Sequence, residues 1–181
     1  MKALSINPAT KVIEEIDIEM KANTVYSFFN SILIDELSSL NQHTIYCDAN
    51  ALSQQKEPYF IGEQLIVGEA LVVGLMGMEE SDVNIPKDEL TKLINHDVND
   101  FYRDVLILLG QSDINLYRTF TIQQDGETLN LNAEWVLYTF DMADERTKEY
   151  FITELTKSLD AKEDTFEYLK KMAQLAINAA G

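Results

Sequence analysis

The longest apolar run of the chain, Leu65 to Met78, constrains the fold more than any other segment. It covers 14 residues and is interrupted by Glu69, so it is too short and too polar to cross a bilayer. Its apolar parts, residues 66–68 and 70–74, predict buried β-strand. The glycines at 68 and 74 indicate a bulge or a close approach of neighbouring backbone.

The residues before this run predict mainly strands. Residues 2–6 and 11–20 indicate two strands joined by a turn at 7–10, where Pro8 presets φ. In the second strand, apolar residues alternate with acidic ones, which places three carboxylates on one face. The apolar set is Val12, Ile16, Ile18 and Met20, with Glu14 among them, and the acidic set is Glu15, Asp17 and Glu19. An amphipathic helix is predicted over 24–37, capped by Asn23 or Thr24, then a strand over 44–47 and a polar loop over 48–58.

The residues after the run predict more helix. Apolar residues recur every three or four positions from Pro86 to Leu109, which predicts a long helix that can break once between residues 95 and 100. A hairpin is expected over 119–131, because Asp125-Gly126 suits a type I′ turn. Residues 135–140 predict a third strand. Two helices over 144–159 and 162–179 follow, with Asp160 and Glu163 as a capping pair for the last one.

These segments predict an α+β fold in two parts. Residues 1–78 are expected to form a small, antiparallel-rich sheet carrying one helix. Residues 79–181 are expected to form a hairpin-led sheet packed by three helices. The N-terminus has no extended apolar stretch that would indicate a secretory signal, and a single cysteine, Cys47, is typical of a reducing, cytoplasmic compartment.

Net charge narrows the choice of partners. The chain carries 31 acidic and 14 basic residues, a formal net charge of −17. Such a charge repels nucleic-acid phosphates and anionic membranes, and it favours cationic partners, including the basic grooves of nucleic-acid-binding proteins. The simpler interpretation is that the acidity only maintains solubility. The acidic residues are spread through patterned segments rather than gathered in a tail, so we expect them to lie on folded elements.

No motif predicts catalysis, a metal or a cofactor. His96 and Asp100 are one helical turn apart, but two ligands do not make a metal site. His43 and Cys47 would lie roughly 13 Å apart along a strand, which is too far for proton transfer. The glycines at 68, 74 and 77 lack the spacing of a phosphate-binding loop. We therefore predict a protein that is not an enzyme.

The N-terminal half resembles a family of small domains of unknown function. The resemblance covers residues 1–75, through the opening segment 1–18, the segment 45–48 and the segment 66–74. Members of that family occur in phage, plasmid and other mobile-element proteins, so the resemblance implies a mobile-genetic-element origin. It implies no catalytic residues. The chain departs from the family at 48–51, where Asp-Ala-Asn-Ala replaces a glycine-containing acidic turn.

Three functions fit these observations. The first is an interaction protein that inhibits a host nucleic-acid-binding defence protein by imitating the charge of DNA. The second is a small-molecule-binding protein or accessory enzyme with a site between the two halves, and the third is a dimerisation module. The oligomeric state stays open.

The first hypothesis rests on carboxylate spacing. Successive carboxylates repeat at roughly 6.6 Å along one face of a strand and at about 6 Å along a helix. Adjacent phosphates of DNA are separated by roughly 6–7 Å. The predicted protein-binding residues are Glu15, Asp17, Glu19, Glu145 and Glu149.

Overall fold

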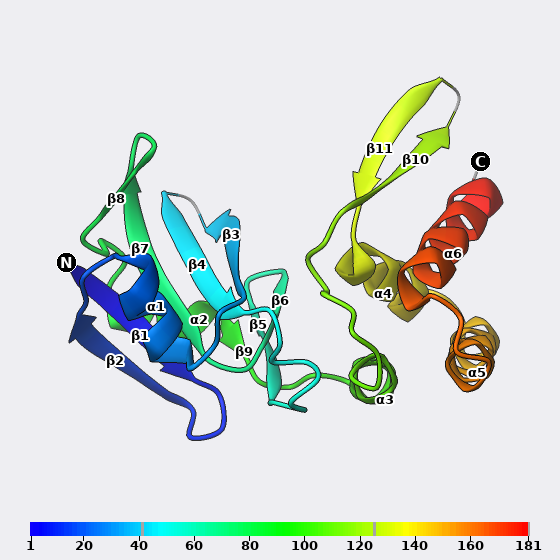
Figure 1. Cartoon of the computed structure of the whole chain (residues 1–181), viewed down its shortest axis with the longest axis horizontal. Helices are drawn as coiled ribbons and strands as arrows, with labels where there is room; N and C mark the ends of the chain where they lie inside the picture. Colours follow the sequence, from blue (N-terminus) through cyan, green and yellow to red (C-terminus); the bar gives the residue numbers. More distant parts are fainter. Residues whose placement is uncertain (41, 125, 181) are drawn as a thin grey trace. The chain divides into compact units, whose positions relative to one another are not determined.

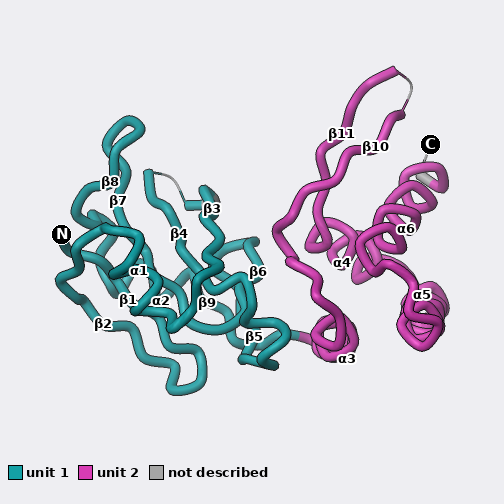
Figure 2. Tube along the Cα trace, in the orientation of Figure 1, with its two compact units in different colours: residues 1–98 teal, residues 99–181 magenta. Residues whose placement is uncertain are grey.

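The chain folds into an α+β structure of two compact units, residues 1–98 and 99–181 (Figures 1 and 2). This computed structural model describes residues 1–40, 42–124 and 126–180. The predicted α+β class is confirmed. The boundary between the units lies twenty residues beyond the predicted one, because the segment after residue 78 is still tied to the N-terminal sheet. The backbone N–H of Val83 donates to the Lys2 carbonyl at 2.9 Å.

Unit 1 is built on an antiparallel sheet with strand order β2-β1-β7-β4-β3, and β8 pairs with the end of β7. The strands of this sheet are β1 (Lys2–Asn7), β2 (Val12–Asp17), β3 (Ile34–Leu40), β4 (His43–Asp48), β7 (Ala70–Met76) and β8 (Glu79–Ser81). The predicted apolar run supplies β7, whose residues 70–73 are fully buried. Strand β2 forms one edge of the sheet.

Both faces of the sheet are covered. On one face, Val25 and Phe29 of helix α1 (Ala22–Phe29) pack with Ala3, Leu71 and Val73. Helix α2 (Lys87–Leu93) contacts β2, and a second antiparallel sheet contacts β4 through β6. This second sheet has the order β6-β5-β9, formed by β5 (Pro58–Ile61), β6 (Gln64–Val67) and β9 (Ile94–Asn95). The two halves of the apolar run thus belong to different sheets.

Two sequence predictions for unit 1 are corrected. The helix predicted over 24–37 ends at Phe29, because Asn30 adopts the left-handed conformation at φ 51° and the chain then forms β3. Its N-cap is Lys21, with no side-chain cap, rather than Asn23 or Thr24. The loop predicted over 48–58 does connect β4 to β5, and the described residues of 1–78 contain the one helix expected there, α1; α2 belongs to unit 1 because the unit boundary lies at residue 98.

Over its described residues, unit 2 combines a hairpin with four helices, one more than the three expected for the C-terminal part, because residues 133–141 are helical. Strands β10 (Phe120–Gln124) and β11 (Glu127–Leu131) pair antiparallel, which confirms the predicted hairpin. Gly126 has the positive φ that the turn requires, at 85°, whereas Asp125 lies outside the described residues. The helices are α3 (Asp100–Leu109), α4 (Ala133–Asp141), α5 (Glu145–Asp160) and α6 (Thr165–Ala180).

Two predictions for unit 2 are wrong. The third strand predicted over 135–140 is helix α4, which Asn132 caps by accepting a hydrogen bond from the backbone N–H of Trp135 at 3.0 Å. The capping pair assigned to Asp160 and Glu163 is replaced by Asp164, whose carboxylate accepts from the backbone N–H of Phe166 and Glu167. The long helix predicted from Pro86 does break, giving α2 and α3 with β9 between them.

Phe151 of α5 is the centre of the core of unit 2. Its ring stacks on Phe140 of α4 at 4.4 Å between centroids and approaches Phe101 of α3 at 6.1 Å and Tyr168 of α6 at 6.4 Å. The side chain is fully buried. One residue therefore joins all four helices.

We predict that Phe151→Ala destabilises unit 2 by about 3–5 kcal/mol, because it leaves a cavity where four helices meet. Urea denaturation followed by circular dichroism measures the loss. The matched control is Tyr150→Ala on the same helix, where the tyrosine is 54% exposed, and it is expected to change stability by less than about 1 kcal/mol. Equal losses for the two variants would contradict this packing role.

Candidate functional site

The predicted carboxylates of the second strand lie at the edge of the unit 1 sheet. Glu15 and Asp17 are exposed on β2, and Glu19 is exposed just after it. The face they share is not wholly polar, however. Glu15 lies opposite Leu4 in the register, and Ile13 on the same face is buried, whereas Val12, predicted to be buried, is 41% exposed. The predicted alternation therefore holds only from Ile16 onward.

Lysines neutralise part of this edge. Lys2 Nζ lies 2.8 Å from Glu15 Oε1, and Lys21 forms an ion pair with Glu19. The hydrogen bond that Lys2 donates to Glu15 raises the pKa of Lys2, so this lysine stays charged. Both pairs are well exposed to solvent and contribute little to stability. Among the described ion pairs of this edge, Asp17 has no lysine partner.

The second predicted group lies on the first two turns of α5. Glu145 and Glu149 are exposed there, one helical turn apart. Lys148 Nζ lies 3.4 Å from carboxylate oxygens of both Glu145 and Asp141, so it neutralises part of the group. Since β2 belongs to unit 1 and α5 to unit 2, the five predicted residues form two groups, each on its own unit.

Asp144 positions the second group. Its carboxylate caps α5 by accepting a hydrogen bond from the backbone N–H of Thr147 at 2.8 Å. This bond lowers the pKa of Asp144 from its usual value of 3.8, because it favours the charged form. The anchored turn then presents Glu145 and Glu149 on its outer side.

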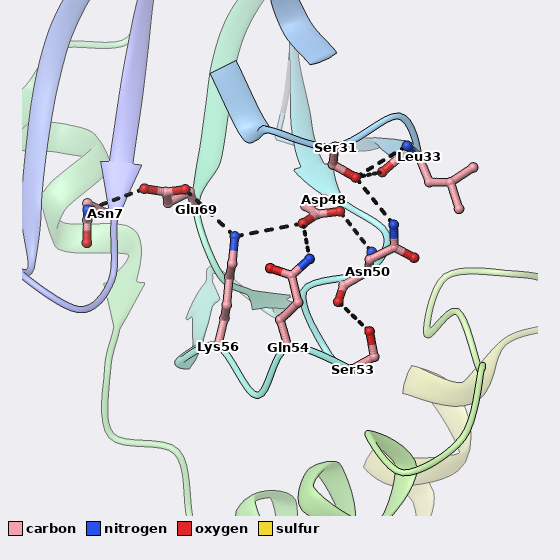
Figure 3. Close-up of polar contacts among 9 residues, drawn as sticks. All are labelled: Asn7, Ser31, Leu33, Asp48, Asn50, Ser53, Gln54, Lys56 and Glu69. Atoms are coloured by element: carbon pink, nitrogen blue, oxygen red, sulfur yellow. Dashed lines mark hydrogen bonds and ion pairs between the residues drawn. The ribbon is translucent and has the colours of Figure 1, made fainter. Parts of the chain in front are cut away.

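A buried polar network that no sequence motif predicted lies at the end of β4 (Figure 3). Asp48 is only 2% exposed, and its carboxylate accepts from the backbone N–H of Asn50 at 2.9 Å and from Gln54 Nε2 at 3.2 Å. Lys56 Nζ lies 3.8 Å from Asp48 Oδ2 and 3.9 Å from Glu69 Oε2. Lys56 thus stands between two carboxylates that are 21 residues apart in sequence.

This network holds the turn after β4 in place. Asn50 Nδ2 donates to Ser31 Oγ at 3.3 Å, and Asn7 Nδ2 donates to Glu69 Oε1 at 3.4 Å, so the network also reaches the ends of α1 and β1. Because the hydrogen-bonding capacity of Asp48 is directed at the protein itself, we interpret the network as structural. In the sequence, this network is indicated only by Asp48, which directly follows the strand predicted over 44–47, and by Asn50 two residues later, a pairing typical of a turn.

The histidines, the cysteine and Asp100, which were weighed as catalytic or metal-binding candidates, do not form a common site. His43 and Cys47 are both buried in β4, and the ring of His96 packs against Tyr59 at 5.7 Å between centroids. Asp100 begins α3 rather than following His96 along one helix. Over the described ranges, no group of three or more His, Cys, Asp or Glu residues is arranged to hold a metal ion.

A cavity of about 480 Å³ in unit 2 has the volume of a ligand site. Several of its polar lining groups already have partners within the protein. Arg118 lies over the Phe166 ring at 4.4 Å, Asp164 caps α6, and Glu163 accepts from Ser158 Oγ at 2.9 Å. We therefore interpret this cavity as part of the packing between α6 and the segment before the hairpin.

Comparison of the chain with protein-family models, with curated proteins and with solved structures found no match. The resemblance of residues 1–75 to a mobile-element family therefore stays a prediction. Within the described part of the chain, no helix combines the length and apolar composition needed to cross a membrane.

We predict that Asp48→Ala destabilises unit 1 by about 1–3 kcal/mol, because Asn50 N–H and the Gln54 amide lose a buried acceptor. Hydrogen exchange should accelerate over residues 49–56 in particular. The control is Glu57→Gln, an exposed carboxylate next to Lys56 in sequence, which should leave exchange unchanged. Unchanged exchange in the Asp48 variant would refute the anchoring role.

A second prediction concerns pH. Because the pKa of Asp144 is lowered in the folded state, its cap stabilises α5 fully above pH 3.8 and is lost as pH falls through the lowered value. The amide resonance of Thr147 should report this loss in an NMR titration. In Asp144→Asn, a neutral cap, the same resonance should show no such transition; a persistent transition would assign it to another group.

Proposed function

We propose that this protein is a non-catalytic interaction protein that binds a basic surface of another protein through its carboxylates. The observation that carries the proposal is that the excess acidity is exposed and exists in both units. Unit 1 has 16 acidic and 6 basic residues, and unit 2 has 15 and 8. Each unit therefore has a negative field of its own, which attracts a cationic partner and accelerates its association.

The placement of β2 supports this proposal. An edge strand is the outermost part of a sheet, so its side chains are accessible to a partner without rearrangement of the fold. Glu15 and Asp17, two residues apart in the strand, repeat at roughly 6.6 Å, near the spacing of DNA phosphates. In the form we favour, the partner is a nucleic-acid-binding protein, whose groove already selects negative charge at such intervals.

The proposal extends to the class of protein to which the partner belongs. A mobile-element origin, implied by the resemblance of residues 1–75, would make a host defence protein the target and inhibition the outcome. A simpler role for the β2 charges is to prevent edge-to-edge pairing of sheets, a common use of charged residues on edge strands. The experiment below separates these two roles.

The test is capture of partners from a bacterial lysate by the immobilised full chain, followed by measurement of association rates. The acidic edge is neutralised with Glu15→Gln, Asp17→Asn and Glu19→Gln together. Neutral residues are preferable to lysines because Lys2 and Lys21 lie beside Glu15 and Glu19. We expect association to slow about tenfold at low salt, binding to weaken steeply with salt, and DNA to compete for the partner.

The matched control changes the net charge of unit 1 by the same amount at other exposed sites, with Glu57→Gln, Glu63→Gln and Asp97→Asn. It should slow association much less than the edge variant. Equal slowing by the two triple variants would mean that only the net charge of unit 1 affects association, and it would contradict a specific role for the β2 carboxylates. Affinity that is independent of salt would contradict the proposal and indicate an apolar interface.

A further inference from the structure

A small cavity in unit 1 combines aromatic and acidic side chains. It has a volume of about 250 Å³ and lies between the start of α1 and strands β3, β4 and β8. Tyr26 and Tyr46 line it together with Glu36 and Glu80, and Val25 contributes to an apolar wall. The volume is below the roughly 300–1,000 Å³ of sites for drug-sized ligands, which suits a single side chain.

The sheet register brings these residues together. Glu36 of β3 lies opposite Tyr46 of β4, so the two side chains share one face of the sheet. Tyr46 lies in turn opposite Leu71 of β7, which packs in the core beneath α1. Glu80 of β8 lies opposite Leu75 of β7 on the same face. Three strands, β3, β4 and β8, therefore contribute side chains to the cavity, and α1 contributes Tyr26.

Tyr46 orients one of the two carboxylates. Its hydroxyl donates a hydrogen bond to Glu80 Oε1. Burial, this hydrogen bond and the negative charges of Glu80 and Glu36 together raise the pKa of Tyr46 well above its usual value of 10. The phenol is thus a neutral donor throughout the physiological range. Glu80, held by Tyr46, and Glu36 both line the cavity, and the negative charge of each acts on Tyr46.

This combination matches the chemistry of arginine. A guanidinium group is planar, donates several hydrogen bonds and stacks on aromatic rings. Its aliphatic stem can lie along an apolar wall while its charged end meets carboxylates. Tyr26 is 40% exposed and lines the cavity. Lys21, the one basic residue of the lining, forms an ion pair with Glu19. Glu36 and Glu80 are both exposed; a negatively charged side chain would be repelled by them, and an apolar one would offer them no hydrogen-bond donor.

We propose that the cavity between α1, β3, β4 and β8 binds an arginine side chain presented by a partner protein, with Glu36 and Glu80 receiving the guanidinium group and Tyr26 stacking on it. This inference deepens the proposed function and rests on it for the source of the arginine. It assigns the partner one anchoring residue in addition to a general basic surface.

The test uses a defined probe, the acetylated and amidated peptide Gly-Arg-Gly, titrated into the ¹⁵N-labelled full chain. We expect shifts of the amide resonances of Tyr26, Glu36 and Glu80, with saturation in the millimolar range. The same peptide with citrulline, a neutral analogue of arginine, should give no saturable shifts. Equal shifts with citrulline, or shifts that map elsewhere, would overturn the proposal.

Variants locate the binding on the chain. Glu36→Gln with Glu80→Gln should weaken binding of the arginine peptide about tenfold, and Tyr26→Ala should weaken it several-fold. The matched control is Glu57→Gln with Glu63→Gln, which removes the same charge from exposed positions that do not line the cavity. A preserved spectrum confirms folding of each variant, and equal weakening by the control pair would refute the site.

The inference and the proposed function fail in different ways. If the peptide does not bind but partner capture still depends on salt and on the β2 carboxylates, the arginine site is wrong and the proposed function stands. If the peptide binds at the cavity but partner association depends on neither salt nor the carboxylates, the arginine site stands and the proposed function is wrong.

Discussion

Burial of β7 on both faces is the constraint on which the rest of unit 1 depends. Residues Ala70 to Val73 have no exposed surface, so apolar side chains project from this strand in both directions. A strand of this kind requires cover above and below the sheet. Helix α1 supplies one cover, and the β6-β5-β9 sheet with α2 supplies the other. The position of β7 between β1 and β4 then determines which segments meet at each face.

Two glycines permit this arrangement. Gly68, with φ 79°, turns the chain from β6 in one sheet to β7 in the other, and a Cβ there would lie 2.8 Å from Lys56 Cδ. A Cβ on Gly74 would lie 2.3 Å from the carbonyl oxygen of Asp82, where the chain returns after β8. Any larger side chain would displace Lys56 at one end of β7 or the backbone after β8 at the other. The turn at Gly68 thus leaves room for Lys56 of the buried network, and Gly74 leaves room for the chain that follows β8, the strand that contributes Glu80 to the cavity.

Charge is distributed so that the protein can be very acidic without burying unpaired carboxylates. Most acidic side chains are exposed, where water and salt screen their repulsion. Asp48 is the only acidic residue that is buried among the described ones, and it has Lys56 nearby and backbone and amide donors on its oxygens. The net charge therefore acts mainly at the surface, where it can attract a partner, and Asp48 serves the fold.

The errors of the sequence predictions have identifiable physical causes. Residues 135–140 are apolar enough for a strand, and a short apolar run does not distinguish a strand from a buried helix by periodicity. The deciding features are the Asn132 cap and the spacing of Val136, Leu137 and Phe140, which face the core from one side of α4. In unit 1, the helix predicted to continue to residue 37 is interrupted at Asn30, and β3 forms because β4 offers it a partner.

The sequence alone determined the features that arise from neighbouring residues. These are the hairpin at 120–131, the amphipathic helices α5 and α6, the pairing of the first two strands and the excess of acidic charge. Only the tertiary structure decided which distant segments pair, because strand order depends on packing across the whole sheet. That order places Lys56 between Asp48 and Glu69, and it brings Tyr46 to Glu80, which is 34 residues away. No local pattern encodes either contact, since each forms only when β7 is buried between β1 and β4.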